Sequence, residues 1–208
     1  MKNKYGCIKS ILDGSEHVFK AQGSMEIPNE YSYKNYLPKV LNQGNEPICV
    51  PCSISSYINW DLNIRNNEDE KDYHINVNEI YDSRSNNDDN GMMIKEALSY
   101  LKHNGVETDN GKYKIKGYAI VGSIETLKRA IVMNGICIGG LPTYNTPNDE
   151  FWINDGSEFL GGHAIAIIGY DEEGFIIRNS WGKSYGYDGY SHMKYEDFNK
   201  FYEIWTLY

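Results

Sequence analysis

The stretch GGHAIAIIGYDEEGFIIRNSWG, residues 161–182, decides the fold. Two apolar runs rich in β-branched residues, HAIAIIGY and FIIRN, flank a short polar turn that ends in glycine. Such runs around a short turn predict an antiparallel hairpin. If the turn centres on its two glutamates, the numbers of paired residues sum to about 345. The hairpin then brings the imidazole of His163 and the carboxamide of Asn179 close together at one end of a sheet.

The rest of the chain has a helix-rich first half and a strand-rich second half. Apolar residues recur at helical spacing over residues 49–64, 93–105 and 123–135, which predicts three helices. The third helix opens with Ser123 and a Thr three residues later, an incomplete capping box. The run ICIGGL that follows predicts another strand. With no internal repeat, this order predicts an α+β fold, and the change from helices to strands allows a division into two lobes.

The length, charge and hydropathy of the chain indicate the size of the domain and exclude some classes of binding partner. The 208 residues suffice for one sizeable domain. The net charge is −9 and Lys and Arg form no cluster, so we expect no nucleic-acid partner. No apolar run is long enough for a membrane span, and residues 1–20 lack the apolar core of a signal peptide. Residues 1–30 are polar with Gly and Pro breakers, which predicts an N-terminal extension that wraps the body.

The stretch LNQGNEPICVPCSISS, residues 41–56, sets Cys49 and Cys52 three residues apart. A redox pair needs a strand before the helix, and none is predicted there. A zinc site needs a second pair of ligands, but Cys7 and Cys137 have no partner nearby in sequence, so we expect no metal. Cys49 falls at the predicted helix start, where the helix dipole and free backbone donors favour the thiolate. Cys49 is therefore the candidate nucleophile, and Cys52 packs one turn further along.

Cys49, His163 and Asn179 are a sufficient set for acyl transfer. The imidazole takes the thiol proton, and the Asn carbonyl oxygen fixes which ring nitrogen faces the sulfur. A donor for the tetrahedral oxyanion is also needed. Gln43, six residues before Cys49, supplies a side-chain amide for that role. The remaining histidines lie in polar stretches and are expected at the surface: His17, His74, His103 and His192.

The segments NQGNEPIC (42–49), GGHAIAIIGYD (161–171) and IIRNSWGKSYGYDGY (176–190) resemble the papain-like cysteine peptidases of the C1 family. The resemblance implies an α+β papain-like two-lobed fold, with a helical left lobe, an antiparallel β-barrel-like right lobe and a cleft between them. It assigns the catalytic roles to Gln43, Cys49, His163 and Asn179. It also places the Trp181 indole over the contact between His163 and Asn179. No cofactor is implied.

The resemblance also implies finer assignments. Asn90, Gly91 and Gly162 fall where the family binds an extended substrate. The domain boundaries become 1–30 for the extension and 31–208 for the peptidase domain. Within that domain, the helical lobe takes about residues 43–110 and the β lobe about residues 111–208.

Two departures from the family pattern concern the nucleophile segment. Val50 stands where the family has Trp, and Pro47 stands where the family has Gly. These departures favour a divergent, compact member like those of bacteria, archaea and large viruses.

A thiol endopeptidase acting on protein or peptide substrates is the leading hypothesis. A Cys–His–Asn amidase, a transglutaminase-like acyl transferase and a deubiquitinating-type hydrolase use the same chemistry and stay open. A binding protein with an occluded or inactive peptidase site is a third possibility. We expect a monomer that is cytoplasmic or otherwise intracellular, or associated with a virion.

Overall fold

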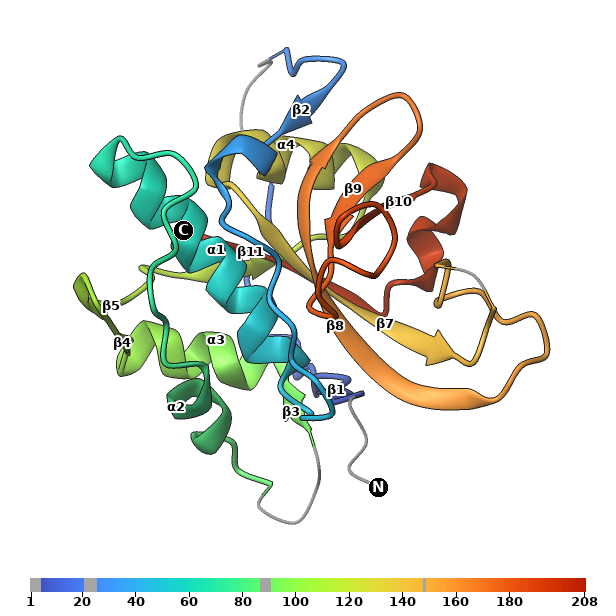
Figure 1. Ribbon diagram of the computed structural model, residues 1–208, viewed down its shortest axis with the longest axis horizontal. Helices are drawn as coiled ribbons and strands as arrows, with labels where there is room; N and C mark the ends of the chain where they lie inside the picture. The colour runs from blue at the N-terminus through green and yellow to red at the C-terminus, as the bar shows by residue number, and fades with distance from the viewer. Residues whose placement is uncertain (1–4, 21–25, 87–90, 148) are drawn as a thin grey trace.

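The computed structural model describes residues 5–20, 26–86, 91–147 and 149–208 of the chain (Figure 1). Helices gather on one side of the molecule and a twisted antiparallel sheet forms the other, with α4 lying over the sheet (Figure 1). Two short 3₁₀ helices, Lys34–Tyr36 and Tyr195–Lys200, lie in the connections. The α-helices are α1 (Cys49–Asn66), α2 (Val77–Asp82), α3 (Ile94–His103) and α4 (Ile124–Asn134).

Seven strands of the described chain form the main sheet, in the order β10-β9-β8-β7-β11-β6, with β2 paired to β8. All of these pairings are antiparallel. The strands are β2 (Tyr31–Ser32), β6 (Tyr118–Ile120), β7 (Cys137–Tyr144), β8 (Phe159–Tyr170), β9 (Phe175–Arg178), β10 (Tyr190–Met193) and β11 (Glu203–Leu207). Within the described residues β6 and β10 stay at opposite edges without pairing. The α+β prediction is confirmed, but the barrel-like right lobe is an open sheet because its edge strands do not meet.

The register of the central hairpin is the one that the sequence predicts. Tyr170 pairs with Phe175, and Ala166 pairs with Arg178, with one irregularity in between. His163 lies seven residues before the turn on β8, and Asn179 follows β9 directly. The predicted meeting of the two side chains is therefore confirmed.

Helix α1 is buried on nearly every side, which differs from the amphipathic helix that the sequence predicts. Its residues from Cys49 to Asn63 are all buried. Small serines make this possible, since the Ser55 hydroxyl donates to the Cys52 carbonyl at 2.7 Å and needs no outside partner. A helix enclosed on all faces belongs to the core of the molecule. The other long helices, α3 and α4, keep one buried face.

The start of α4 corrects one expectation. Ser123 and Thr126 form a complete capping box: the Thr126 backbone N–H donates to the Ser123 hydroxyl at 3.2 Å, and the Ser123 N–H donates to the Thr126 hydroxyl at 3.0 Å. A threonine hydroxyl thus performs the role usually taken by Glu or Gln.

The N-terminal segment runs across both halves of the molecule, and we call residues 5–19 the strap. Its strand β1 (Cys7–Ile8) pairs in parallel with β3 (Met92–Met93), just before α3. Further along, Phe19 donates its backbone N–H to the Ile120 carbonyl on β6 at 2.9 Å. In Figure 1, β1 lies at the foot of α1 beside β8. A small hairpin, β4 (Val106–Thr108) and β5 (Gly111–Tyr113), completes the helical side. Among the described helices, none has the length and apolar character needed to cross a membrane.

Candidate active site

Cys49 is the first residue of α1 and is fully buried. No side chain caps this helix end, so its free backbone N–H groups remain near the sulfur. Burial raises the pKa of the Cys49 thiol to about 11, although hydrogen bonds from the backbone of Ala164 and Gly6 act to lower it. Ala164 directly follows His163 on β8, so the thiol lies beside the predicted base. Burial therefore favours the thiol over the thiolate while the site is closed.

His163 is fully buried on β8, and its Nε2 lies 2.7 Å from the Asn179 Oδ1. Because an amide oxygen only accepts, Nε2 carries the hydrogen. The Ser180 backbone N–H also donates to the same oxygen, at 2.7 Å. Two donors therefore fix the Asn179 side chain, and Asn179 fixes the imidazole. The predicted His–Asn pair is present.

Aromatic rings enclose the imidazole. The Trp181 ring stacks on His163, with centroids 4.5 Å apart and planes at 28°. The Phe151 ring meets His163 edge-on at 5.4 Å, and Tyr185 meets Trp181 at 5.2 Å. The sequence identified Trp181 but missed Phe151, which comes from the loop between β7 and β8. These rings exclude water from the contact between His163 and Asn179 and so strengthen it.

Gln43 lies in the turn before α1 and is 6% exposed. Its Oε1 accepts the Ser180 hydroxyl at 2.6 Å, and its Nε2 donates to the Glu46 carbonyl at 2.8 Å. Ser180, which no sequence pattern indicated, thus connects the glutamine to the segment after β9 that carries Asn179. The oxyanion role of Gln43 stays a prediction.

The strap passes directly over the site. The Gly6 carbonyl accepts the Met92 backbone N–H at 2.8 Å. A side chain at Gly91 would begin 2.9 Å from that carbonyl oxygen, and one at Gly162 would begin 2.0 Å from the Cys7 carbonyl oxygen. The strap therefore lies between the two predicted substrate-binding glycines. Asn90, the third residue of that prediction, lies outside the described residues.

The strap continues past the imidazole. The Tyr5 ring meets the Trp181 ring edge-on, with centroids 6.1 Å apart. Gly6 packs so tightly on the nucleophile turn that a Cβ there would lie 2.1 Å from the Pro47 carbonyl oxygen. Cys49 is thus covered by backbone, which accounts for its complete burial.

The other thiols are free and buried: Cys7, Cys52 and Cys137. Cys52 lies one turn inside α1, where its backbone N–H already donates to the Ile48 carbonyl at 3.0 Å, and burial raises the pKa of its thiol to about 12. It therefore lacks the free backbone donors that surround Cys49 at the helix start. The four histidines predicted at the surface are all exposed. Within the described chain, no three His, Cys, Asp or Glu residues gather closely enough to hold a metal ion.

The sequence is similar to known cysteine proteases. Residues 150–204 match the family model described as papain family cysteine protease. Fruit bromelain of Ananas comosus is 31% identical over 132 residues, covering 56% of this chain and 36% of that protein. An uncharacterized peptidase C1-like protein of Acanthamoeba polyphaga mimivirus is 28% identical over 105 residues, covering 44% of this chain and 34% of that protein.

Solved structures agree in fold. Xylellain, a cysteine protease from Xylella fastidiosa, superposes with a TM-score of 0.83 at 22% identity, covering 99% of this chain and 96% of that one. A procathepsin B from Trypanosoma congolense gives a TM-score of 0.78 at 15% identity, covering 99% of this chain and 87% of that one. The chain spans about a third of the length of fruit bromelain and of the mimivirus protein.

Proposed function

The chain belongs to the papain-like cysteine peptidases, and from that membership we propose that it is a thiol endopeptidase acting on protein or peptide substrates. One observation carries the proposal: the His163 Nε2 is held 2.7 Å from the Asn179 Oδ1 under the Trp181 ring, next to a cysteine at a helix N-terminus. The comparisons do not favour the amidase, transferase or binding-protein alternatives.

The reaction proceeds through an acyl-enzyme. With Nε2 protonated and bonded to Asn179, the His163 Nδ1 is free of a ring hydrogen and takes the proton of the Cys49 thiol. The thiolate attacks the scissile carbonyl carbon and forms a C–S bond. The imidazolium then returns the proton to the leaving amine as the C–N bond breaks. Water, deprotonated by the same imidazole, hydrolyses the thioester and restores the thiol.

The tetrahedral intermediate needs donors for its oxygen. We assign this role to the backbone N–H of Cys49 and the side-chain amide of Gln43. The Gln43 Nε2 carries two hydrogens, and the bond to the Glu46 carbonyl needs only one of them, so the other can donate to the oxyanion. Its Oε1 accepts the Ser180 hydroxyl, which holds the amide in place.

We propose further that the strap closes the cleft in this state. Its backbone contacts both Gly91 and Gly162, which are predicted to bind extended substrate, and it covers the Cys49 thiol. A peptide substrate and the strap therefore compete for the same place, and turnover requires the strap to leave. The strap belongs to the same chain, so we propose that the closed form is a monomer.

The proposal is tested by covalent labelling with an epoxide inhibitor of thiol proteases. The full chain and its Cys49→Ala and Cys52→Ala variants are incubated with the inhibitor, and the adduct is located by mass spectrometry. We expect an adduct on Cys49 in wild type and in Cys52→Ala, and none in Cys49→Ala. Cleavage of casein should follow the same order. An adduct on Cys52, or casein cleavage that survives in Cys49→Ala, would contradict the proposal.

A further inference from the structure

A cavity of about 470 Å³ lies at the end of α1 that is remote from Cys49, and it takes no part in the proposed reaction. The last turns of α1 supply one wall, the segment from the end of β5 to Lys116 a second, and the end of α4 with Gly135 a third. In Figure 1 this part of α1 points away from β1, the strand of the strap. The volume is in the range of pockets that hold small organic molecules.

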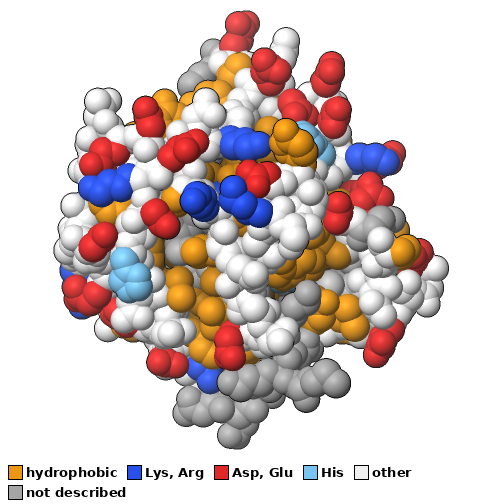
Figure 2. Space-filling model, in the orientation of Figure 1, with side chains coloured by type: hydrophobic (Ala, Val, Ile, Leu, Met, Phe, Trp, Pro, Cys, Tyr) orange, Lys and Arg blue, Asp and Glu red, His pale blue; other side chains and the backbone are white. Residues whose placement is uncertain are grey.

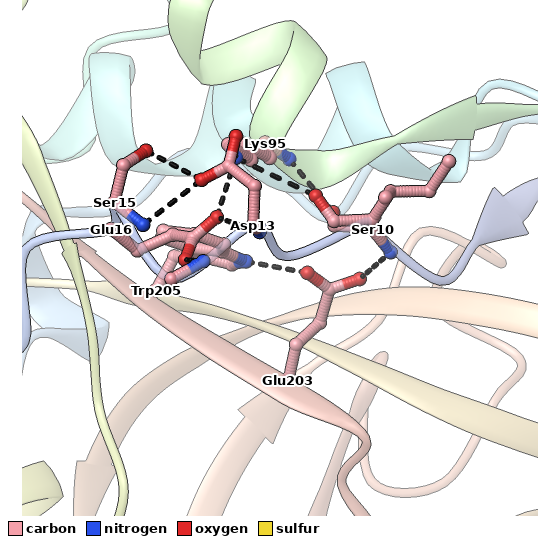
Figure 3. A network of polar contacts seen from close by, with 9 residues as sticks. Ser10, Asp13, Ser15, Glu16, Lys95, Glu203 and Trp205 are labelled. Atoms are coloured by element: carbon pink, nitrogen blue, oxygen red, sulfur yellow. Dashed lines mark hydrogen bonds and ion pairs between the residues drawn. The ribbon is translucent and has the colours of Figure 1, made fainter.

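The Trp60 side chain lines this cavity with an N–H group that lacks an acceptor. The residue is 8% exposed, and its Nε1 is buried without a hydrogen-bond partner among the described residues. By contrast, the Trp205 indole donates to the Glu203 carboxylate at 2.6 Å (Figure 3). The Trp152 indole donates to the Asp197 carboxylate at 3.2 Å. A buried donor without an acceptor costs free energy, so a ligand that supplies an acceptor is favoured.

The indole ring of Trp60 is held in place by its neighbours. A Cβ at Gly135 would lie 1.9 Å from the six-membered ring of the indole. The ring centroids of Tyr33 and Tyr57 lie 4.7 and 5.4 Å from that of Trp60. The N–H group is therefore fixed before a ligand arrives, which lowers the entropy cost of binding. Both tyrosines also line the cavity, and aromatic walls suit a flat ring.

Cations outnumber carboxylates among the side chains that line the cavity. Asp61, the one acidic side chain among the described residues of its walls, accepts the Tyr113 hydroxyl and pairs with Arg65 at 2.6 Å. Lys114 donates to a backbone carbonyl at 2.6 Å. Lys116 is exposed and forms no ion pair with any described residue. Three cations against one carboxylate leave an excess of positive charge at this cavity, although the net charge of the chain is −9.

We propose that this cavity is a binding site for a small aromatic carboxylate. A carboxylate oxygen accepts the Trp60 N–H, and Lys116 neutralises the charge of the ligand. The excess of cations selects an anion over a neutral carbonyl compound, because a hydrogen bond to a charged acceptor is stronger than one to a neutral acceptor. The aromatic walls select a ring over an aliphatic chain. Because Cys49, His163 and Asn179 lie outside the cavity, the binding does not depend on the proposed peptidase activity.

The test follows the indole N–H signals by NMR. The full-length chain, labelled with ¹⁵N at tryptophan, is titrated with 2-naphthoate and with its neutral isostere 2-naphthamide. The Trp60 signal is identified by its loss in Trp60→Phe, and independently by magnetisation transfer from the adjacent tyrosine rings. We expect 2-naphthoate to shift this signal in a saturable way, with a Kd of about 1 mM or lower for a ligand of this size. The Trp152 and Trp205 signals should stay in place, since their N–H groups already have acceptors.

Two variants assign the preference for an anion to the cavity. Lys116→Gln removes one positive charge at an exposed position, so the fold should be kept. We expect it to weaken binding of 2-naphthoate at least about threefold and to leave binding of 2-naphthamide unchanged. Lys102→Gln removes the same charge from an exposed position on α3 that does not line the cavity, and both affinities should equal those of wild type. Added salt should weaken binding of 2-naphthoate only.

The outcomes of this test are independent of peptidase activity. The full-length Cys49→Ala chain should bind 2-naphthoate as wild type does, so a failure of the proposed reaction leaves the result intact. Three results would each overturn the binding site: no shift of the Trp60 signal, equal affinity for 2-naphthoate and 2-naphthamide, or unchanged binding of 2-naphthoate in Lys116→Gln.

Discussion

At the scale of single residues, the hydrogen bond between His163 and Asn179 decides what the site can do. It leaves the hydrogen on Nε2, so that Nδ1 is the nitrogen available as a base. The wrong tautomer would direct a hydrogen at the thiol instead of a lone pair. Phe151, Trp181 and Tyr185 keep water away from this bond.

We expect Asn179→Ala to lower kcat by about 10²-fold, because the imidazole loses the partner that fixes its tautomer and orientation. KM should change little, since Asn179 is buried behind the imidazole and does not line the strap. Steady-state kinetics on a fluorogenic peptide measures both constants. The exposed residue Asn78 provides the control, and Asn78→Ala should behave as wild type. Full activity in Asn179→Ala would contradict the assigned role.

The helical spacing of the apolar residues predicted that α1 begins at about Cys49. That predicted start distinguished Cys49 from Cys52, and the structure places Cys49 at the first helical position. The hydrogen-bond partner of the Gln43 amide could not be predicted from the sequence, because it is a backbone carbonyl whose position depends on the geometry of the turn. Phe151 was missed for a similar reason, since its loop carries no pattern that aims a ring at His163.

At the scale of elements, the strap is the segment whose position the sequence predicted least. Residues 1–30 showed only polar composition and turn residues, which fit many paths. The observed path depends on close backbone approaches, such as Gly6 against Pro47, that no local pattern encodes. The β8–β9 hairpin was predictable in register because a short turn fixes it locally.

We expect Gly6→Ala to open the site. The new Cβ would lie 2.1 Å from the Pro47 carbonyl oxygen, so the strap has to move away from Cys49. Burial raises the pKa of the Cys49 thiol to about 11, and letting water in favours the thiolate. Alkylation by iodoacetamide should therefore speed up at neutral pH, and the midpoint of its pH profile should fall below that of wild type.

The exposed strap residue Lys9 gives the matched control for this variant. Lys9→Ala should leave both the alkylation rate and its pH midpoint unchanged. If Gly6→Ala reacted as slowly as wild type across the whole pH range, the strap would not be what buries the thiol.

The ion pairs of Lys95 give a second way to loosen the strap. Lys95→Ala removes the contacts to Asp13 and Glu16. Because pairs of this kind are partly exposed and screened by salt, we expect only about threefold faster epoxide labelling of Cys49. Added salt should speed labelling of wild type but not of Lys95→Ala. Lys102→Ala, an exposed position on the same helix, should respond to salt as wild type does.

At the scale of the whole molecule, Arg178 connects the sheet to the helical side. It is 3% exposed at the end of β9. Its guanidinium donates to the Ser56 hydroxyl on α1 at 3.2 Å, and to the Pro38 and Lys39 carbonyls at 2.9 and 3.0 Å. The residue just before Asn179 therefore ties the catalytic strand to the helix that carries the nucleophile.

We expect Arg178→Lys to lower the free energy of unfolding by about 3 kcal/mol, because an ammonium cannot reach all of these buried acceptors. Urea unfolding followed by circular dichroism measures the change. Arg65→Lys is the matched control, since the Arg65 side chain is 58% exposed and its loss should cost much less. Equal stability of the two variants would show that Arg178 is not a structural connection.

The surface charge and the fold class could be predicted from the sequence, whereas closure of the sheet could not. The surface carries acidic and basic side chains interspersed over the visible face, as the composition suggested (Figure 2). The α+β class followed from the order of helix and strand patterns. The sequence did not predict whether the sheet closes into a barrel. Closure depends on the distance between the edge strands β6 and β10, which is set by the twist of all the strands between them.

The strap is anchored beyond the cleft, at Ile120 through Phe19, and the chain returns to the sheet where Tyr31 pairs with Tyr170 on β8. A strap released from Cys49 therefore stays tethered near the cleft, at an effective concentration of the order of millimolar. Closure is then a unimolecular equilibrium whose position does not change when the protein is diluted. A free peptide of the strap sequence would have to reach similar concentrations to compete, whereas a single cut within the strap, between the part that covers Cys49 and Phe19, would make opening irreversible.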